Sequence, residues 1–386
     1  MIYKHALKYD KKLREIRHAL HKIPELEFCE HKTTEFIENE LDMLGIEHER
    51  LLDTGVVGLI KGKKGKGNTI LIRADIDALP IKELNESEFK SQNEGVMHAC
   101  GHDAHITCLL GMAYILKDMD YNFYGNIKMV FQPAEEGQGG ALPLIKNGVM
   151  ENPKVDACIA LHVDPSCDVG VIKLKNDAIM ASPDDFYLKI VGVGGHGANP
   201  QECINPIYIA SELALIIEKE FFNHKNCIVS VCTINGGTKN NIIPNYVEIT
   251  GTARSLNEET RLFIKTKIDE LAKKMCKKYN SNYEYQFNFL YPPVINDENM
   301  NNLVINSAKE LSCFKDVIMQ EEPSMTGDDF SYFANLVPSS YFKLGTGNKS
   351  INYPLHSPRF DIDEDCLVLG AAIMAKASLD YLEKNK

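Results

Sequence analysis

The sequence has no apolar run long enough to cross a membrane and no excess of positive charge. No stretch approaches the roughly 20 apolar residues of a spanning helix, and the polar segment Met1 to Lys12 lacks the apolar core of a signal peptide. The formal net charge of -12, with a pI near 5.5, repels phosphates over most of the surface. We therefore expect no membrane association and no nucleic-acid partner, and a small molecule is the natural partner.

The 11 cysteines include no C-x-x-C pair and are odd in number. That pattern is typical of buried free thiols in a reducing compartment rather than of a disulfide framework, so we expect a cytoplasmic protein. Cys100 is the exception, because histidines surround it in the sequence.

Short apolar runs alternate with amphipathic segments over the first 180 residues. Helices are predicted over Lys4–His21, Lys32–Leu44 with Gly45 as C-cap, and about His105–Lys117. Strands are predicted over Val56–Ile60, Thr69–Ile72, Ile127–Phe131 and Ala157–Leu161. This alternation indicates an α/β fold with a largely parallel sheet covered by helices.

The pattern changes between about Ala181 and Tyr291. The predicted order there is strand, helix, strand, strand, helix, strand, which is the ferredoxin-like arrangement, and the earlier pattern resumes at Pro292. At 386 residues the chain also exceeds the usual size of a single core. We therefore predict an α/β catalytic domain over residues 1–180 and 292–386, with an inserted α+β lid domain over residues 181–291.

Cys100 and His102 are the most informative residues, because a thiolate and an imidazole this close together can bind a transition metal. They precede a predicted helix, whose positive end is expected to lower the thiol pKa. Further donors come from four other segments: Asp75 and Asp77, Glu135 and Glu136, His162, and His356. Three of these segments follow predicted strands, where open α/β sheets bind their ligands. The mixture of donors suits Zn²⁺, Mn²⁺, Co²⁺ or Ni²⁺, and their number favours two metals.

The pair Glu135-Glu136 lies in a tight loop between Pro133 and Gly137. Neighbouring side chains on such a loop point apart, so one can bind metal while the other serves as a general base. Asp75 and Asp77, with Arg73, are interpreted as groups that orient metal-bound imidazoles, although they could form only a buried ion-pair cluster. Taken alone, His162 and His356 would rather be structural histidines, so their metal role depends on the combination.

Three residues of the predicted lid are candidates for substrate contacts. His196, in a glycine-flanked turn, suits hydrogen bonding to an oxygen that becomes negative, or is a plain surface histidine. Asn241 and Arg254 could hold a substrate carboxylate, and Arg254 could equally form a structural ion pair.

Together these residues make the chain resemble the M20 metallopeptidase family, in its amidohydrolase branch, subfamily D. That branch holds hippurate hydrolases, N-acetyl-diaminopimelate deacetylases, aminoacylase-like enzymes and auxin-amino acid conjugate hydrolases. The resemblance covers essentially the whole chain, and its motifs are Arg73–Pro80, Met97–Asp103, Gln132–Gly137, Gly194–His196, Asn241–Pro244 and His356–Phe360.

The resemblance implies a phosphorylase/hydrolase-like catalytic domain that cleaves the amide of N-acyl amino acids. It implies two divalent metal ions per subunit, bound by Cys100, His102, Glu136, His162 and His356, with Cys100 as the bridging ligand. Glu135 would be the general base and Asp77 would orient a ligand. His196 would stabilise the oxyanion, across the interface of a homodimer, while Asn241 and Arg254 would bind the substrate carboxylate. Asp328 departs from the family pattern, which commonly has Glu at that position.

Two alternatives stay open at the level of sequence. In the first, Cys100 is a nucleophile with His102 or His105 as its base, which leaves Glu135 and Glu136 without a role. In the second, a non-catalytic protein on the same fold binds acyl amino acids without turnover.

Overall fold

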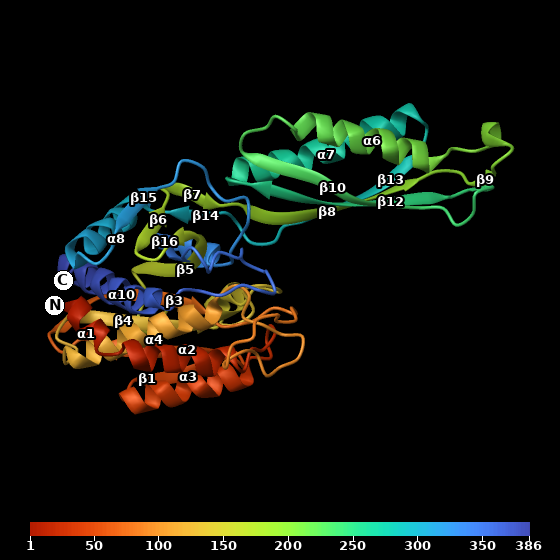
Figure 1. Cartoon of the computed structure of the whole chain (residues 1–386). Helices are drawn as coiled ribbons and strands as arrows, with labels where there is room; N and C mark the ends of the chain where they lie inside the picture. Colours follow the sequence, from red (N-terminus) through yellow and green to blue (C-terminus); the bar gives the residue numbers. More distant parts are fainter. The chain divides into compact units, whose positions relative to one another are not determined.

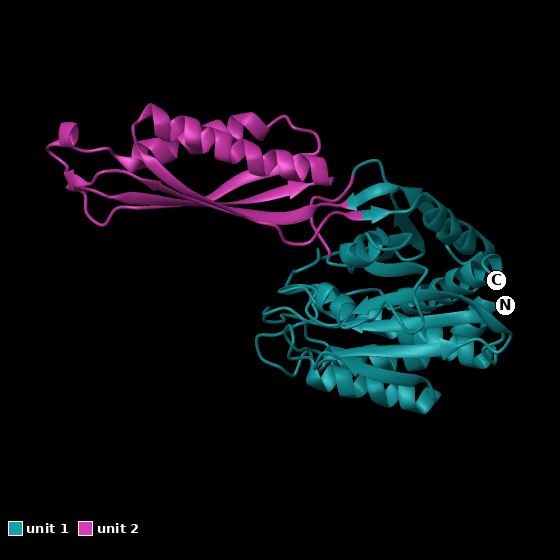
Figure 2. Cartoon of the chain, turned by 180° about the vertical axis from the view of Figure 1, so that it is seen from behind, with its two compact units in different colours: residues 1–179, 295–322, 329–386 teal, residues 180–294, 323–328 magenta.

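The computed structural model describes residues 1–386, which divide into two compact units (Figures 1 and 2). Unit 1 comprises Met1–Ile179, Ile295–Glu322 and Asp329–Lys386, and unit 2 comprises Met180–Val294 and Pro323–Asp328. The insertion predicted over residues 181–291 falls inside unit 2, which also takes in the short second segment.

Unit 1 is built on an eight-stranded sheet with the order β1-β2-β4-β3-β5-β16-β6-β15. The four central strands β4, β3, β5 and β16 run parallel, while β1, β2 and β6 join through antiparallel pairs. The bounds of the strands are β1 (Glu47–Leu51), β2 (Gly55–Lys61), β3 (Gly65–Asp75), β4 (Tyr124–Gln132), β5 (Ala157–Asp168), β6 (Val171–Leu174), β15 (Asp316–Met319) and β16 (Ser339–Gly347). The predicted α/β class with a largely parallel sheet is confirmed.

The helices of unit 1 follow the apolar spacing of the sequence, and α4 and α10 pack on each other and on β3. Their bounds are α1 (Ile2–Leu7), α2 (Asp10–His21), α3 (His31–Leu44), α4 (His102–Asp118), α5 (Ala141–Lys146), α8 (Glu298–Leu311), α9 (Ser331–Ala334) and α10 (Asp365–Lys384). The helix predicted over Lys4–His21 is instead two helices, α1 and α2. Gly45 caps α3 as predicted, with a φ of 70°. None of the helices is both long and apolar enough to span a membrane.

Unit 2 contains a four-stranded antiparallel sheet, β10-β12-β8-β13, with two helices on one face (Figure 1). Residues of β8 and β12 alternate between buried and more exposed, because only one face of the sheet is covered. The bounds are β8 (Ser182–Val191), α6 (Pro206–Phe221), β10 (Cys227–Asn235), β12 (Tyr246–Ser255), α7 (Glu258–Lys278) and β13 (Asn282–Asn288).

The remaining elements are short. A two-stranded ribbon joins β9 (Gly195–His196) to β11 (Ile242–Ile243), and η1 (Pro200–Glu202) follows β9. A second ribbon joins β7 (Asp177–Met180) to β14 (Val294–Asn296).

The parallel strands of unit 1 bring their carboxyl ends to one edge of the sheet. Asp75 is the last residue of β3 and pairs with Gln132, the last residue of β4. His162 differs from the prediction, since it lies within β5 and not beyond its end. The strand continues because β16 goes on pairing with β5 as far as Asp168. The segments that carry the predicted metal donors therefore meet at this edge.

Candidate metal centre and catalytic loop

Cys100 and His102 lie at the start of α4, on either side of Gly101. Gly101 occupies the N-cap position with a φ of 81°, a left-handed conformation that glycine adopts without strain. A Cβ atom there would lie 2.5 Å from Cγ2 of Val163. Only glycine therefore lets the chain turn tightly enough to present both side chains from one helix end.

Glu135 and Glu136 lie in the loop between β4 and α5, which we call the catalytic loop (residues 133–140). The Asp77 carboxylate accepts hydrogen bonds from the backbone amides of Glu135 and Glu136, at 3.0 and 2.9 Å. The same side chain lies 3.3 Å from Nδ1 of His102. Asp77 thus links the loop to the start of α4. Its own carboxylate is not part of any of the groups that could hold a metal ion.

Two of the groups that could hold a metal ion share Cys100, and within each group the ligand atoms lie within 4.8 Å of one another. One set is Cys100, His102 and His162, and the other is Cys100, Glu136 and His356. Sγ of Cys100 is 3.5 Å from Nε2 of His162, and Nε2 of His356 is 3.0 Å from Oε1 of Glu136. The structure therefore brings together five donors, with the thiol common to both sets.

Nε2 of His102 is buried and makes no hydrogen bond, and Oε1 of Glu136 has Nε2 of His356 beside it at 3.0 Å. An unpaired buried polar atom is costly, so Nε2 of His102 calls for a ligand. Nδ1 of His102 donates to the backbone oxygen of Asp77 at 2.8 Å, and Nδ1 of His162 donates to that of Val163 at 2.8 Å. Both imidazoles thus turn Nε2 toward the cluster, which fits the binding of divalent cations.

Burial and the carboxylates of Glu136 and Glu135 raise the pKa of the Cys100 thiol well above its ordinary value. The sequence-based expectation of a lowered pKa is therefore wrong for the protein without metal. The helix start is a weaker influence than the loss of water and two nearby negative charges. Without a cation, Cys100 keeps its proton and is a poor nucleophile.

The histidines of the cluster differ in their electrostatics. Burial lowers the pKa of His102, but the carboxylates of Asp75 and Asp77 outweigh it and raise the pKa to about 10. Burial, reinforced by His105, lowers the pKa of His162 to about 3. His162 is therefore neutral and ready to bind a cation, whereas His102 must first release a proton.

Asp75 connects the cluster to the buried charge network behind it. Its carboxylate accepts from Nδ1 of His105 and, at 2.6 Å, from Nη1 of Arg73. Nε2 of His105 in turn accepts from the backbone amide of Val163 at 3.0 Å. Both ring nitrogens of His105 are thus engaged, which removes it as a base for Cys100.

Asp329 is a further acid that the sequence analysis did not single out. It accepts from Nη2 of Arg73 at 3.2 Å and from the backbone amide of Ala141 at 2.9 Å. The sequence did offer one signal for Asp329, because it directly follows Asp328 in a motif shared with the family.

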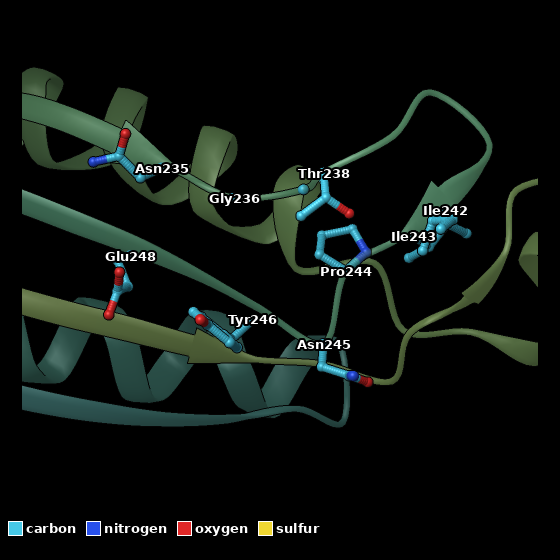
Figure 3. A pocket seen from close by; sticks show the side chains of 10 residues that line it. Asn235, Gly236, Thr238, Ile242, Ile243, Pro244, Asn245, Tyr246 and Glu248 are labelled. Atoms are coloured by element: carbon cyan, nitrogen blue, oxygen red, sulfur yellow. The ribbon is translucent and has the colours of Figure 1, made fainter.

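His196 and Asn241 come together in unit 2, because β9 pairs with β11 and the amide of Gly197 donates to the Asn241 carbonyl at 2.9 Å. Nδ1 of His196 accepts from the amide of Ala198 at 3.0 Å, so Nε2 carries the proton and can donate. Next to this ribbon, a cavity of about 410 Å³ is lined by residues from Asn235 to Glu248 (Figure 3).

Arg254 lies at the other end of unit 2. From Tyr246 to Arg254 strand β12 advances about 26 Å, at about 3.3 Å per residue. Within one chain, Arg254 and the ribbon that follows Asn241 are therefore at opposite ends of β12.

Comparison with known proteins places this site in a family. The profile of peptidase family M20/M25/M40 matches residues 71–380. Thermostable carboxypeptidase 1 of Saccharolobus solfataricus is 39% identical over 96% of this chain and 95% of its own length. N-acetyl-L-cysteine deacetylase of Bacillus subtilis is 35% identical over 98% and 90%. A solved dinuclear metal binding peptidase of Bacillus subtilis, from the M20 family, is 32% identical with a TM-score of 0.88 over 97% and 99%.

The chain therefore belongs to peptidase family M20/M25/M40. It is a hydrolase that acts on amides, and the predicted cofactor, a pair of divalent metal ions, is confirmed.

Proposed function

We propose that this enzyme hydrolyses N-acyl amino acids to a carboxylic acid and a free amino acid. The observation that carries the proposal is the pair of donor sets that share Cys100, with Glu135 on the same loop as Glu136. The names of the relatives support it, since a deacetylase of N-acetyl-L-cysteine and a carboxypeptidase both release a free amino acid from an amide.

We assign the two cations to the five clustered donors. His102 and His162 would bind one, Glu136 and His356 the other, and Cys100 both. When bound, the cations polarise the amide carbonyl and lower the pKa of water. They also favour the thiolate of Cys100, whose proton is otherwise held tightly.

Glu135 is proposed as the general base and acid. It is buried, and an oxygen of its carboxylate lies within 4.8 Å of ligand atoms of His102 and Glu136. It would take the proton of the attacking water and return that proton to the leaving amine. The bond that breaks is the amide C–N bond, so the products are a carboxylate and an amine.

His196, Asn241 and Arg254 are proposed to bind the substrate from unit 2. Nε2 of His196 would donate to the amide oxygen as it becomes negative, and Arg254 would bind the carboxylate with its guanidinium. Because β12 separates Arg254 from Asn241, we propose a homodimer in which His196 and Asn241 serve the partner's site. The cytoplasmic location stays a prediction, supported by eleven free cysteines.

The test is the release of free amino acid from a panel of N-acetyl, N-benzoyl, N-succinyl and N-indolylacetyl amino acids and dipeptides. Each substrate is compared with an analogue whose carboxylate is amidated. We expect the amidated analogues to lose about tenfold or more in kcat/KM, because a charge-assisted hydrogen bond is lost. An Arg254→Gln variant should lose most of that discrimination.

Equal cleavage of the free and amidated forms would contradict recognition of an amino acid carboxylate. Hydrolysis of no member of the panel by the metal-loaded enzyme would contradict the substrate class itself.

A further inference from the structure

Acidic side chains accept hydrogen bonds from four backbone amides of the catalytic loop. Besides Asp77, which accepts from Glu135 and Glu136, the loop is held by Glu27, which accepts from the amide of Gln138 at 2.6 Å. Oε1 of Glu30 accepts from the amide of Ala134 at 2.9 Å. Glu30 thus contacts the residue that directly precedes the two glutamates.

Glu30 stands at the N-cap position of α3 but makes no capping hydrogen bond there. Capping is performed by Glu25, whose Oε2 accepts from the amides of Lys32 and Thr33 at 2.9 and 3.0 Å. A side chain at an N-cap ordinarily bonds to its own helix. Glu30 instead directs a fully buried carboxylate, 0% exposed, to a loop 104 residues away.

Ala134 has an unusual backbone conformation within the catalytic loop. Its φ is 57°, a left-handed conformation that costs a non-glycine residue roughly 1–2 kcal/mol. Its carbonyl accepts from the amide of Gly139 at 2.9 Å, which closes the loop, and its amide donates to Glu30. Since Glu135 and Glu136 follow at once, the torsions of Ala134 set the direction in which both side chains leave the backbone.

We propose that Glu30 is a positioning residue that holds Ala134 in its left-handed conformation and thereby aims Glu135 and Glu136. The proposal rests on the proposed function for the role of Glu135, but its effect on Glu136 concerns metal binding alone. Glu30 is not among the clustered metal donors, so we assign it a positioning role through its contact with the loop.

The role of Glu30 requires a hydrogen-bond acceptor rather than a charge. Burial raises the pKa of Glu30 to about 7, so the neutral and the ionised acid coexist near neutral pH. Either form can accept from the Ala134 amide through Oε1. A glutamine at this position has an acceptor of the same reach and should serve as well.

The experiment compares Glu30→Ala with Glu30→Gln and with the double variant Glu30→Ala/Ala134→Gly. The single variant Ala134→Gly completes the double-mutant cycle. Glu40→Ala is the matched control, because Glu40 is also a buried acid of α3, 4% exposed, but contacts Lys12 and Tyr114. Three quantities are measured for each: kcat and KM on the best substrate, Mn²⁺ affinity, and amide hydrogen exchange of residues 134–136.

We expect Glu30→Ala to lower kcat by about ten- to hundredfold with little change in KM, since a small misplacement of a catalytic group costs that much. Mn²⁺ affinity should fall and exchange at 134–136 should rise. Glu30→Gln should stay within about threefold of wild type, and Ala134→Gly should restore most of the loss, because glycine adopts the left-handed conformation freely. Glu40→Ala should lower stability without this pattern.

The proposal is overturned if Glu30→Ala leaves exchange and Mn²⁺ affinity unchanged, or if the glycine rescue fails while Glu30→Gln is as impaired as Glu30→Ala. If no substrate is turned over but affinity and exchange follow the expected pattern, positioning by Glu30 stands and the proposed substrate class fails.

Discussion

Cys100 illustrates how far a single residue can be predicted from sequence. Its pairing with His102 in a short motif predicts that it is a metal donor, because few other roles bring a thiol and an imidazole so close. The state of its proton could not be predicted, since that depends on burial and on carboxylates from a distant loop, which raise the pKa. The local sequence shows which residues can bind a metal, whereas the pKa of such a residue depends on the groups that the fold places around it.

The protons on Cys100 and His102 should make metal binding depend on pH. Both groups have raised pKa values in the metal-free protein, His102 to about 10, so both are protonated at pH 7. A cation must displace these protons, and its affinity should therefore rise with pH. His162, with its pKa lowered to about 3, has no proton to release at Nε2.

Calorimetric titration of stripped protein with Mn²⁺ in buffers of different ionisation enthalpy measures this release. We expect about one to two protons released at pH 7, and about one fewer for Cys100→Ser. Binding without proton release, and with equal affinity at pH 6.5 and 8.5, would show that these groups are not the ligands.

At the scale of elements, the position of a residue at a strand end predicts which segments lie close together, because parallel strands bring their carboxyl ends to one edge of the sheet. The length of β5 was underestimated, since Asp164 and Pro165 look like a strand end while pairing with β16 in fact continues. The contact between Glu30 and Ala134 could not be predicted at all. It joins residues 104 apart in the sequence and depends on where the fold places the start of α3 against the catalytic loop.

The turn at Gly101 offers a direct test of how α4 presents its ligands. A Gly101→Ala variant should lose at least about 2 kcal/mol of unfolding free energy, from the left-handed φ and from the clash with Val163, and should bind less than two metals. Gly95→Ala is the control, because Gly95 has a φ of 80° but no atom within 4 Å of the added Cβ.

Urea unfolding and metal analysis give the two quantities. We expect Gly95→Ala to lose only the backbone part, about 1 kcal/mol, with its full metal content. Equal losses in the two variants would mean that close packing at Gly101 does not matter.

The contact between α2 and α4 should make stability depend on pH. Burial lowers the pKa of His21, but its bond to Asp103, 2.7 Å from Nδ1, raises the pKa to about 9 from 6.5. The folded protein therefore binds this proton more tightly than the unfolded chain does. The resulting stability is fully present below pH 6.5 and is lost as the pH rises through 9.

Comparing wild type with His21→Leu from pH 6 to pH 10 measures this contribution. The difference in unfolding free energy should be about 3 kcal/mol at pH 6 and should shrink steadily toward pH 10. A difference that stays constant over this range would rule out a charged His21.

At the scale of the whole molecule, the predicted change from a parallel α/β pattern to a ferredoxin-like one corresponds to two units with separate cores. The prediction of this change rests on the periodicity of the apolar residues in the sequence. It could not place Pro323–Asp328, because that short segment has no periodicity and joins unit 2 through contacts.

The proposed exchange of residues between subunits is testable with two inactive variants. His196→Ala lacks the oxyanion donor and Glu135→Gln lacks the base. If His196 serves the partner's site, each mixed dimer contains one complete site, so random exchange should restore about a quarter of wild-type activity. If His196 serves its own site, no mixed dimer is complete, and mixing should restore nothing.

The most direct test of the central claim is a titration of stripped enzyme with Mn²⁺ while the release of amino acid from an N-acyl amino acid is followed. We expect turnover to require metal and to reach its plateau at two equivalents. Glu135→Gln should bind the same two equivalents yet turn over about 10²–10⁴-fold more slowly, because only the base is lost. Full activity in the presence of excess chelator, or normal turnover by Glu135→Gln, would contradict the mechanism.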